Sequence, residues 1–212
     1  MNAWEFTGII EVGIFARTPA LGQVKQRLAK DIGAENALRV YCALFDHTLK
    51  SCIRAHRLLP PLTPRLWYTG ETPTAFLPPS FEFATQLQPG HDFGSNMQAV
   101  IDRIHEPGIS AVMIIGSDHP ELSAAHLIDM ASNLIHSQVS IGPTEDGGFW
   151  ALATRIALPD IFSDMTFSTP TVYDELIERL DARGISHTPG ATLFDVDDIR
   201  SLARMKKNPL HE

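Results

Sequence analysis

Residues 111–116 read AVMIIG and are followed at once by Ser117 and Asp118. A short run of apolar, partly β-branched residues that ends in a glycine is typical of a strand buried on both faces of a sheet. Residues 9–16 (IIEVGIFA) repeat this pattern near the start of the chain. The two runs predict the central strands of an α/β domain.

Helical patterns alternate with further short strands along the chain. In residues 34–58, apolar side chains recur at three and four positions, as on one face of a helix. We expect further helices over 94–105, 123–136 (with Ser123 as N-cap), from Thr169-Pro170 to Gly184, and from Asp197 or Asp198. Further strands are expected over 65–69, 81–87, 139–142, 149–153 and 192–196. The alternation predicts an α/β/α sandwich with a mixed, mostly parallel sheet, and we expect residues 1–212 to form a single domain.

Composition and charge limit the classes of partner. The chain has 212 residues, 44% of them hydrophobic and 20% charged, and a net charge of −8. This composition excludes a disordered chain, and the negative balance argues against nucleic acid or a membrane surface as partners. The sequence shows no signal peptide or membrane span, and its two cysteines fit no metal or disulfide pattern, so we expect a cytoplasmic protein. The acidic residues gather after residue 70, whereas residues 1–70 are basic overall.

The loop that follows the first strand is a candidate phosphate site. Ligands of open α/β sheets bind at the carboxyl ends of the strands, and this loop runs from Arg17 through Gly22 to Lys25 and Arg27. A glycine loop that enters a helix offers free backbone N–H groups to an anion, and the cations would add charge. The alternative is an ordinary solvated helix start with surface cations.

Carboxylates at two other places form a candidate metal site. Asp118 directly follows the strand at 111–116, and Asp195 and Asp197 are two positions apart, so both would face one side of an extended segment. Three such carboxylates suit a hard cation, Mg²⁺ or Mn²⁺. The alternative for Asp197 or Asp198 is capping of the last helix.

A fourth candidate is the segment 142–150, which contains Glu145-Asp146-Gly147-Gly148. Paired glycines allow a ligand to approach the backbone closely, and Asp146 could accept hydrogen bonds from sugar or ribose hydroxyls. The alternative is a tight hairpin turn, for which Asp-Gly is a strong signal. Phe149 and Trp150 are expected in the core.

Several motifs occur in an order that resembles a bacterial glycosyltransferase-like family, which includes the arsenosugar biosynthesis glycosyltransferases and is related to the 2-phospho-lactate guanylyltransferases. The motifs are FARTPALGQVKQRL, QPGHDFGSNM, IIGSDHPEL, GPTEDGGFWAL, FSTPTV and FDVDDIRSL, and they extend from about Ile9 to Leu202. The resemblance implies the nucleotide-diphospho-sugar transferase (GT-A-like) fold. The chain departs from the family pattern at His91, His119 and the Phe149-Trp150 pair, which bears on the identity of the substrate.

The resemblance also implies roles for residues that match the family motifs. Lys25 and Arg27 match the loop that handles nucleotide or substrate phosphates, and Asp118 with Asp195 and Asp197 matches the metal site. Asp146, Gly147 and Gly148 match the substrate loop, and the hydroxyls of Ser168 and Thr169 match a loop that reaches a phosphate or carboxylate.

Residues and resemblance together suggest a Mg²⁺- or Mn²⁺-dependent transferase with a nucleotide or nucleotide-sugar donor and a small-molecule acceptor. Asp118, Asp146 and Lys25 are its candidate catalytic residues. Glycosyl transfer ranks first, nucleotidyl transfer to a small phosphorylated acid second, and a non-catalytic nucleotide-binding module third. We do not expect a haloacid-dehalogenase-type phosphatase, because the 14 residues after Asp198 do not supply the Lys and later carboxylates of that site. The sequence leaves the oligomeric state open.

Overall fold

The computed structural model describes residues 8–207, and seven strands in this part of the chain form one sheet in the order β3-β2-β1-β4-β6-β5-β7. β1 (Ile9–Arg17) is central and runs parallel to β2 and β4. The others are β2 (Leu62–Thr69), β3 (Ala84–Leu87), β4 (Ile109–Ile115), β5 (Val139–Pro143), β6 (Phe149–Thr154) and β7 (His187–Pro189). β6 is antiparallel to both of its neighbours, so the sheet is mixed and mostly parallel, as predicted.

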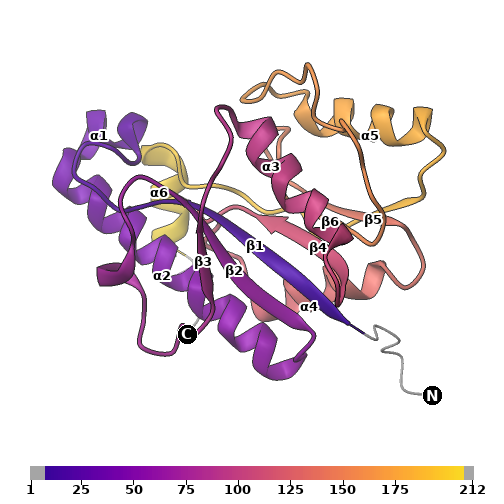
Figure 1. Cartoon of the computed structure of the whole chain (residues 1–212). Helices are drawn as coiled ribbons and strands as arrows, with labels where there is room; N and C mark the ends of the chain where they lie inside the picture. The colour runs from indigo at the N-terminus through magenta and orange to yellow at the C-terminus, as the bar shows by residue number, and fades with distance from the viewer. Residues whose placement is uncertain (1–7, 208–212) are drawn as a thin grey trace.

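Helices cover both faces of the sheet (Figure 1). α2 (Ala34–Leu58) and α4 (Ala124–Asn133) pack on one face, and α3 (Phe93–Ile101) and α5 (Val172–Ala182) on the other. The short α1 (Gln26–Ile32) and the last helix, α6 (Ile199–Lys207), lie together at one end of the sheet. The α/β/α sandwich is therefore confirmed. No helix within residues 8–207 combines the length and the apolar character needed to cross a membrane.

The two faces of β1 explain its nearly continuous apolar sequence. Ile10 and Ile14 are fully buried in the cluster beneath α2 and α4, whereas Phe15 belongs to the cluster beneath α3 and α5. A strand covered on both faces has no solvent side and needs no polar alternation. Its one buried charge, Glu11, is paired with Arg65 and Arg103 at 3.0 and 2.5 Å.

Several local predictions are confirmed at residue level. α2 occupies the predicted residues 34–58. Ser123 caps α4, its hydroxyl accepting a hydrogen bond from the backbone N–H of His126 at 3.4 Å. Gly184 follows the C-cap of α5 with φ +65°, the conformation that favours glycine at this position. The helix predicted over 94–105 divides into α3 and a short 3-10 helix at Asp102–His105.

Two predictions about the last third of the chain are wrong. Residues 192–196 form no strand; only an isolated bridge links Leu193 to Thr144. These residues lie in a segment, residues 190–198, that we call the C-terminal strap. The strap leaves the sheet because Phe194 and Val196 pack away from it, in a cluster that includes Leu28. In addition, α5 begins at Val172, after the predicted Thr169-Pro170 start.

Candidate functional site

A pocket of about 880 Å³ opens at the edge of the sheet where β1 and β4 end. Its wall includes the end of β1 with the β1–α1 loop, the end of β4, the β5–β6 turn, residues 167–172 and the C-terminal strap, together with Tyr41, Thr69, Gln88 and Phe93. Because β6 is antiparallel, the turn before it lies at the same edge as the carboxyl ends of the parallel strands. The pocket is thus where ligands of open α/β sheets bind.

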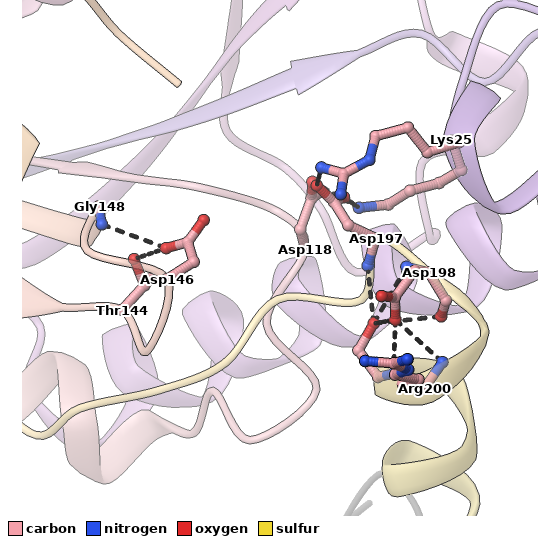
Figure 2. Close-up of polar contacts among 10 residues, drawn as sticks. Lys25, Asp118, Thr144, Asp146, Gly148, Asp197, Asp198 and Arg200 are labelled. Carbon is pink, nitrogen blue, oxygen red and sulfur yellow. Dashed lines mark hydrogen bonds and ion pairs between the residues drawn. The ribbon is translucent and has the colours of Figure 1, made fainter. Parts of the chain in front are cut away.

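Lys25 is the centre of the charged part of this pocket (Figure 2). Its Nζ lies 2.7 Å from Asp118 Oδ2 and 2.9 Å from Asp197 Oδ1, and its side chain is only 4% exposed. Lys25 has φ 47°, in the left-handed region that is rare for residues with a side chain, and immediately precedes α1. The residue with this unusual backbone conformation is thus the same residue whose ammonium is buried between two carboxylates from distant parts of the chain.

The ion pairs set the direction in which the pKa values of Lys25 and Asp118 are shifted. Burial disfavours the charged form of Lys25, but Asp118 and Asp197 outweigh it and raise the pKa of the ammonium. Burial likewise opposes ionisation of Asp118, but the neighbouring Lys25 lowers the pKa of this carboxylate. Lys25 and Asp118 are therefore both charged at neutral pH.

The other predicted phosphate ligands are less enclosed. Arg27 is 75% exposed, and its Nη1 lies 3.5 Å from Asp197 Oδ2. Arg17 lines the pocket and donates a hydrogen bond to the carbonyl of Gln23 at 3.0 Å. Gly22 has φ 73° in the same loop but is not among the described residues that line the pocket.

Tyr41 on α2 is a pocket residue that the sequence interpretation missed. Its hydroxyl accepts a hydrogen bond from the backbone N–H of Arg17 at 2.9 Å and donates one to the Arg17 carbonyl at 2.7 Å. Burial, with the nearby charge of Asp118, raises the pKa of Tyr41 to about 12, so the hydroxyl remains protonated. Helical spacing alone places Tyr41 in the core, and nothing in the sequence marks its contact with the loop.

The three aspartates of the strap have different surroundings. Asp198 caps α6, because its Oδ1 accepts hydrogen bonds from the backbone N–H groups of Arg200 at 2.9 Å and Ser201 at 2.8 Å. Asp197 does not cap the helix, and its carboxylate forms an ion pair with Lys25 instead. Burial and the carboxylates of Asp197 and Asp146 raise the pKa of Asp195 to about 6. Burial and the neighbouring carboxylates therefore both favour the protonated form of Asp195.

Contacts with two loops hold the strap in place. The Phe194 carbonyl lies 3.3 Å from Nδ1 of His119, and the Val196 N–H donates to the Asp118 carbonyl at 3.2 Å. Burial lowers the pKa of His119, so its imidazole is neutral and Nδ1 acts as the donor. From α6, the Arg204 guanidinium stacks 3.9 Å from the centre of the Phe194 ring. His119 thus connects the end of β4 to the strap.

Asp146 lies in the turn between β5 and β6, in a group apart from Lys25 and Asp118 (Figure 2). Its Oδ1 accepts hydrogen bonds from the Thr144 hydroxyl at 2.6 Å and the Gly148 N–H at 3.1 Å. Gly147 has φ +90° and lies so close to the Pro170 carbonyl that a Cβ would collide with it. The predicted hairpin is present, and Asp146 and Gly148, though not Gly147, line the pocket.

Residues 167–172 form the wall beside this turn. Ser168 and Thr169, which the sequence assigns to substrate binding, both line the pocket, and Ser168 has φ 64°. Trp150 is core, at 1% exposed, but Phe149 lines the pocket instead of being fully buried. The sequence interpretation also missed an aromatic series at this wall, in which Phe93 makes edge contacts with Phe15 and Phe167.

The three predicted metal ligands, Asp118, Asp195 and Asp197, have the right chemistry for a divalent cation, and two of them already lie close together. Asp118 and Asp197 already converge on a positive charge, the Lys25 ammonium, and carboxylate oxygens are the ligands that Mg²⁺ and Mn²⁺ prefer. Asp195 is close enough to Asp197 and Asp146 for their charges to act on it, and a cation would relieve that repulsion. Within residues 8–207, however, no three acidic, His or Cys side chains are close enough together to hold an ion as they stand. Binding would therefore require Lys25 to yield at least one carboxylate.

Comparison with solved structures identifies the fold. A candidate nucleotide-diphospho-sugar transferase from Desulfovibrio desulfuricans has a TM-score of 0.83 and 24% identity, with 94% of this chain and 88% of that chain covered. 4-Diphosphocytidyl-2C-methyl-D-erythritol synthase from Anaerococcus prevotii has a TM-score of 0.63 and 9% identity, with 95% and 99% covered. Glucosyl-3-phosphoglycerate synthase from Mycobacterium tuberculosis, in complex with Mn²⁺, UDP and glucosyl-3-phosphoglycerate, has a TM-score of 0.57 and 11% identity, with 95% and 77% covered. The predicted nucleotide-diphospho-sugar transferase fold is confirmed.

The family follows from the sequence itself. Residues 52–169 match the model of the family described as "Uncharacterized protein conserved in bacteria (DUF2064)", and the chain belongs to this family. Among curated proteins, none matches the chain. The matched residues include β4 with Asp118, and the β5–β6 turn with Asp146, but neither Lys25 nor the strap.

Proposed function

We propose that this protein is a metal-dependent transferase that uses a nucleotide-activated substrate, and that it transfers a glycosyl group from a nucleotide sugar in the cytoplasm. The observation that carries the proposal is the position of Lys25, whose ammonium joins Asp118 to Asp197 in the pocket at the carboxyl ends of β1 and β4. Fold relatives that bind UDP or CTP support the use of a nucleotide.

The donor's phosphates would bind beside the β1–α1 loop. Lys25, Arg17 and Arg27 supply the positive charge there, and Asp118 with Asp197, joined by Asp195, would hold Mg²⁺ or Mn²⁺. A divalent ion at that place would neutralise charge that develops on the departing phosphate oxygens. Lys25 would then turn from its carboxylates to the same oxygens and stabilise the leaving group electrostatically.

The acceptor would bind at the β5–β6 turn. One oxygen of Asp146 is occupied by the Thr144 hydroxyl and the Gly148 N–H. The other oxygen, Oδ2, has no hydrogen-bond partner within residues 8–207, which leaves it free for an acceptor hydroxyl. Asp146 would orient that hydroxyl and remove its proton, with the hydroxyls of Ser168 and Thr169 as further contacts.

Nucleotidyl transfer is the second candidate, favoured by fold relatives that include a CMP-linked sugar-acid synthetase in complex with CTP. In that reaction a substrate oxygen attacks the α-phosphorus of a nucleoside triphosphate and pyrophosphate leaves. One fold hosts both reactions, so the pocket's location does not choose between them. A guanylyltransferase-like reaction and arsenosugar synthesis remain specific hypotheses within these two candidates.

One experiment separates the candidates. The purified protein is incubated with Mg²⁺, pooled sugar nucleotides and nucleoside triphosphates, and a pool of small acceptors, and the products are identified by mass spectrometry. Release of a nucleoside diphosphate supports glycosyl transfer, and release of pyrophosphate supports nucleotidyl transfer. Thermal stabilisation by a nucleotide without any consumption would instead indicate a binding module. Asp118→Asn should abolish metal-dependent turnover, and full activity in this variant contradicts the metal proposal.

A further inference from the structure

The positive charges of the pocket all come from one side. Within residues 8–207, the lysines and arginines that line it are Arg17, Lys25 and Arg27, and all three belong to the end of β1 and the segment after it. Lys25 already compensates two carboxylates, and Arg27 approaches one of them. These cations match the phosphates of one nucleotide donor, and none is left over for a second anion.

The opposite wall has a different chemistry. The β5–β6 turn and residues 167–172 contribute hydroxyls from Thr144, Ser168 and Thr169, and a single charge, the carboxylate of Asp146. Arg204 reaches this turn, but its guanidinium pairs with Glu145 at 2.6 Å and Glu121 at 3.5 Å and does not line the pocket. An anionic group at this wall would meet the charge of Asp146 without a partner, which disfavours its binding.

Aromatic side chains complete this wall. Phe93, at the start of α3, is 49% exposed, and its ring makes edge contacts with Phe15 and Phe167 at centroid distances of 6.1 and 5.1 Å. Phe149 lines the pocket on the same side. Exposed apolar surface that adjoins convergent polar groups is typical of a ligand pocket, where it packs against an apolar face of the ligand.

We propose that the acceptor is an uncharged hydroxyl compound with an apolar face, such as an unphosphorylated sugar, a glycoside or an alcohol, and not a phosphorylated or carboxylated acid. This proposal rests on the proposed transferase function and specifies its second substrate. It follows from the placement of Asp146 and three hydroxyls beside the exposed ring of Phe93 and the half-buried ring of Phe149, on a wall to which residues 8–207 contribute no lysine or arginine.

The reaction that this acceptor undergoes is balanced without a further reactant. The acceptor oxygen forms a bond to the anomeric carbon of the donor sugar, and the bond from that carbon to the diphosphate oxygen breaks. The electron pair of the broken bond leaves with the nucleoside diphosphate. The acceptor's hydroxyl proton passes to Oδ2 of Asp146, which later releases it to water.

The test compares acceptors that differ only in a phosphate. Glycerol is paired with glycerol 3-phosphate and glucose with glucose 6-phosphate, and phenyl glucoside is added as an acceptor with an apolar face. Binding to the wild-type protein is measured by saturation-transfer NMR with Mg²⁺ and a nucleoside diphosphate pool. We expect each neutral compound to bind about tenfold more tightly than its phosphorylated partner, and phenyl glucoside to bind more tightly than glucose.

Two variants test the structural cause. Thr169→Lys adds a cation to the acceptor wall and should improve binding of the phosphorylated compounds about tenfold, whereas the matched control Thr169→Gln should not. Phe93→Ala should remove the preference for phenyl glucoside over glucose. Failure of either variant to change selectivity in this way contradicts the assignment of this wall to the acceptor.

Two results with wild-type protein overturn the proposal: equal or tighter binding of the phosphorylated members, or no binding by any neutral member. The proposed transferase function is judged separately by thermal stabilisation with nucleoside diphosphate and Mg²⁺, which requires no acceptor. The acceptor proposal therefore fails alone if a nucleotide binds but the neutral compounds do not.

Discussion

The ammonium of Lys25 lies 2.7 Å from Asp118, a residue 93 positions away in the chain, and also joins Asp118 to Asp197 of the C-terminal strap. A cation thus lies between two of the carboxylates that we assign to a metal. At the proposed metal site, lysine and a divalent ion would compete for the same oxygens, and this competition would have measurable consequences.

Replacement of Lys25 by methionine should have opposite effects on two ligands. Without the ammonium, Asp118 and Asp197 lose the buried cation that they share, so Mn²⁺ alone should bind about tenfold more tightly, whereas a nucleoside diphosphate should bind about tenfold more weakly. Isothermal titration calorimetry measures both. The control is Lys50→Met, which removes an exposed ion pair with Asp46 on α2 and should alter neither affinity. Weaker binding of both ligands in Lys25→Met would mean that Lys25 positions the carboxylates and does not compete with the metal.

Asp195 should make the protein more stable in weak acid than at neutral pH. Its pKa is raised to about 6 in the folded protein, against about 3.9 for an unfolded aspartate. Between these values the folded state binds more protons than the unfolded state, so the free energy of unfolding falls as the pH rises from about 4 to 6. Asp195→Asn should therefore stabilise the protein by on the order of 2 kcal/mol at pH 7 and have little effect at pH 4.

Urea unfolding between pH 4 and pH 8 measures this dependence. Asp197→Asn is the contrasting variant, because it removes the ion pair with Lys25 and should destabilise the protein at pH 7. A pH-independent difference between wild type and Asp195→Asn would contradict the raised pKa.

Arg204 of α6 should restrict the motion of two segments that carry pocket carboxylates, the β5–β6 turn and the C-terminal strap. It pairs with Glu145, next to Asp146, and stacks over Phe194, next to Asp195. Arg204→Met should reduce the free energy of unfolding by only about 1 kcal/mol, because the ion pair is exposed. Hydrogen exchange should nevertheless accelerate in residues 144–148 and 193–197. Lys206→Met on the same helix is the control, and equal acceleration in both variants would show that the effect is not specific to Arg204.

Gly147 should be far less tolerant of substitution than Gly184, although both have positive φ values, +90° and +65°. A Cβ at Gly147 collides with the Pro170 backbone, whereas a Cβ at Gly184 meets nothing within 4 Å. We expect Gly184→Ala to cost about 1 kcal/mol of stability and Gly147→Ala at least about 2 kcal/mol, because residues 167–172 must move. Thermal unfolding measures both, and equal costs would contradict the close packing of the turn against Pro170.

Much of the fold was predictable because local pattern and tertiary environment agree. The apolar runs at 9–16 and 111–116 can be satisfied only by strands covered on both faces, and they became β1 and β4. The exact match of α2 reflects a long amphipathic repeat, for which periodicity is most informative. The strap was misassigned because an alternation of apolar and acidic residues is equally compatible with a strand and with an extended segment that packs across other elements.

The sequence by itself determined the strand ends at which Asp118 and Asp146 occur and the residue types able to handle phosphate and metal, because these depend on local patterns and side-chain chemistry. Only the tertiary structure decided that Lys25 pairs with Asp118 and Asp197, that Asp198 caps α6, and that no lysine or arginine within residues 8–207 lines the wall proposed for the acceptor. Those facts depend on which distant segments meet. That meeting is set by the order of strands in the sheet and by the packing of the strap against α1, to which no local pattern corresponds.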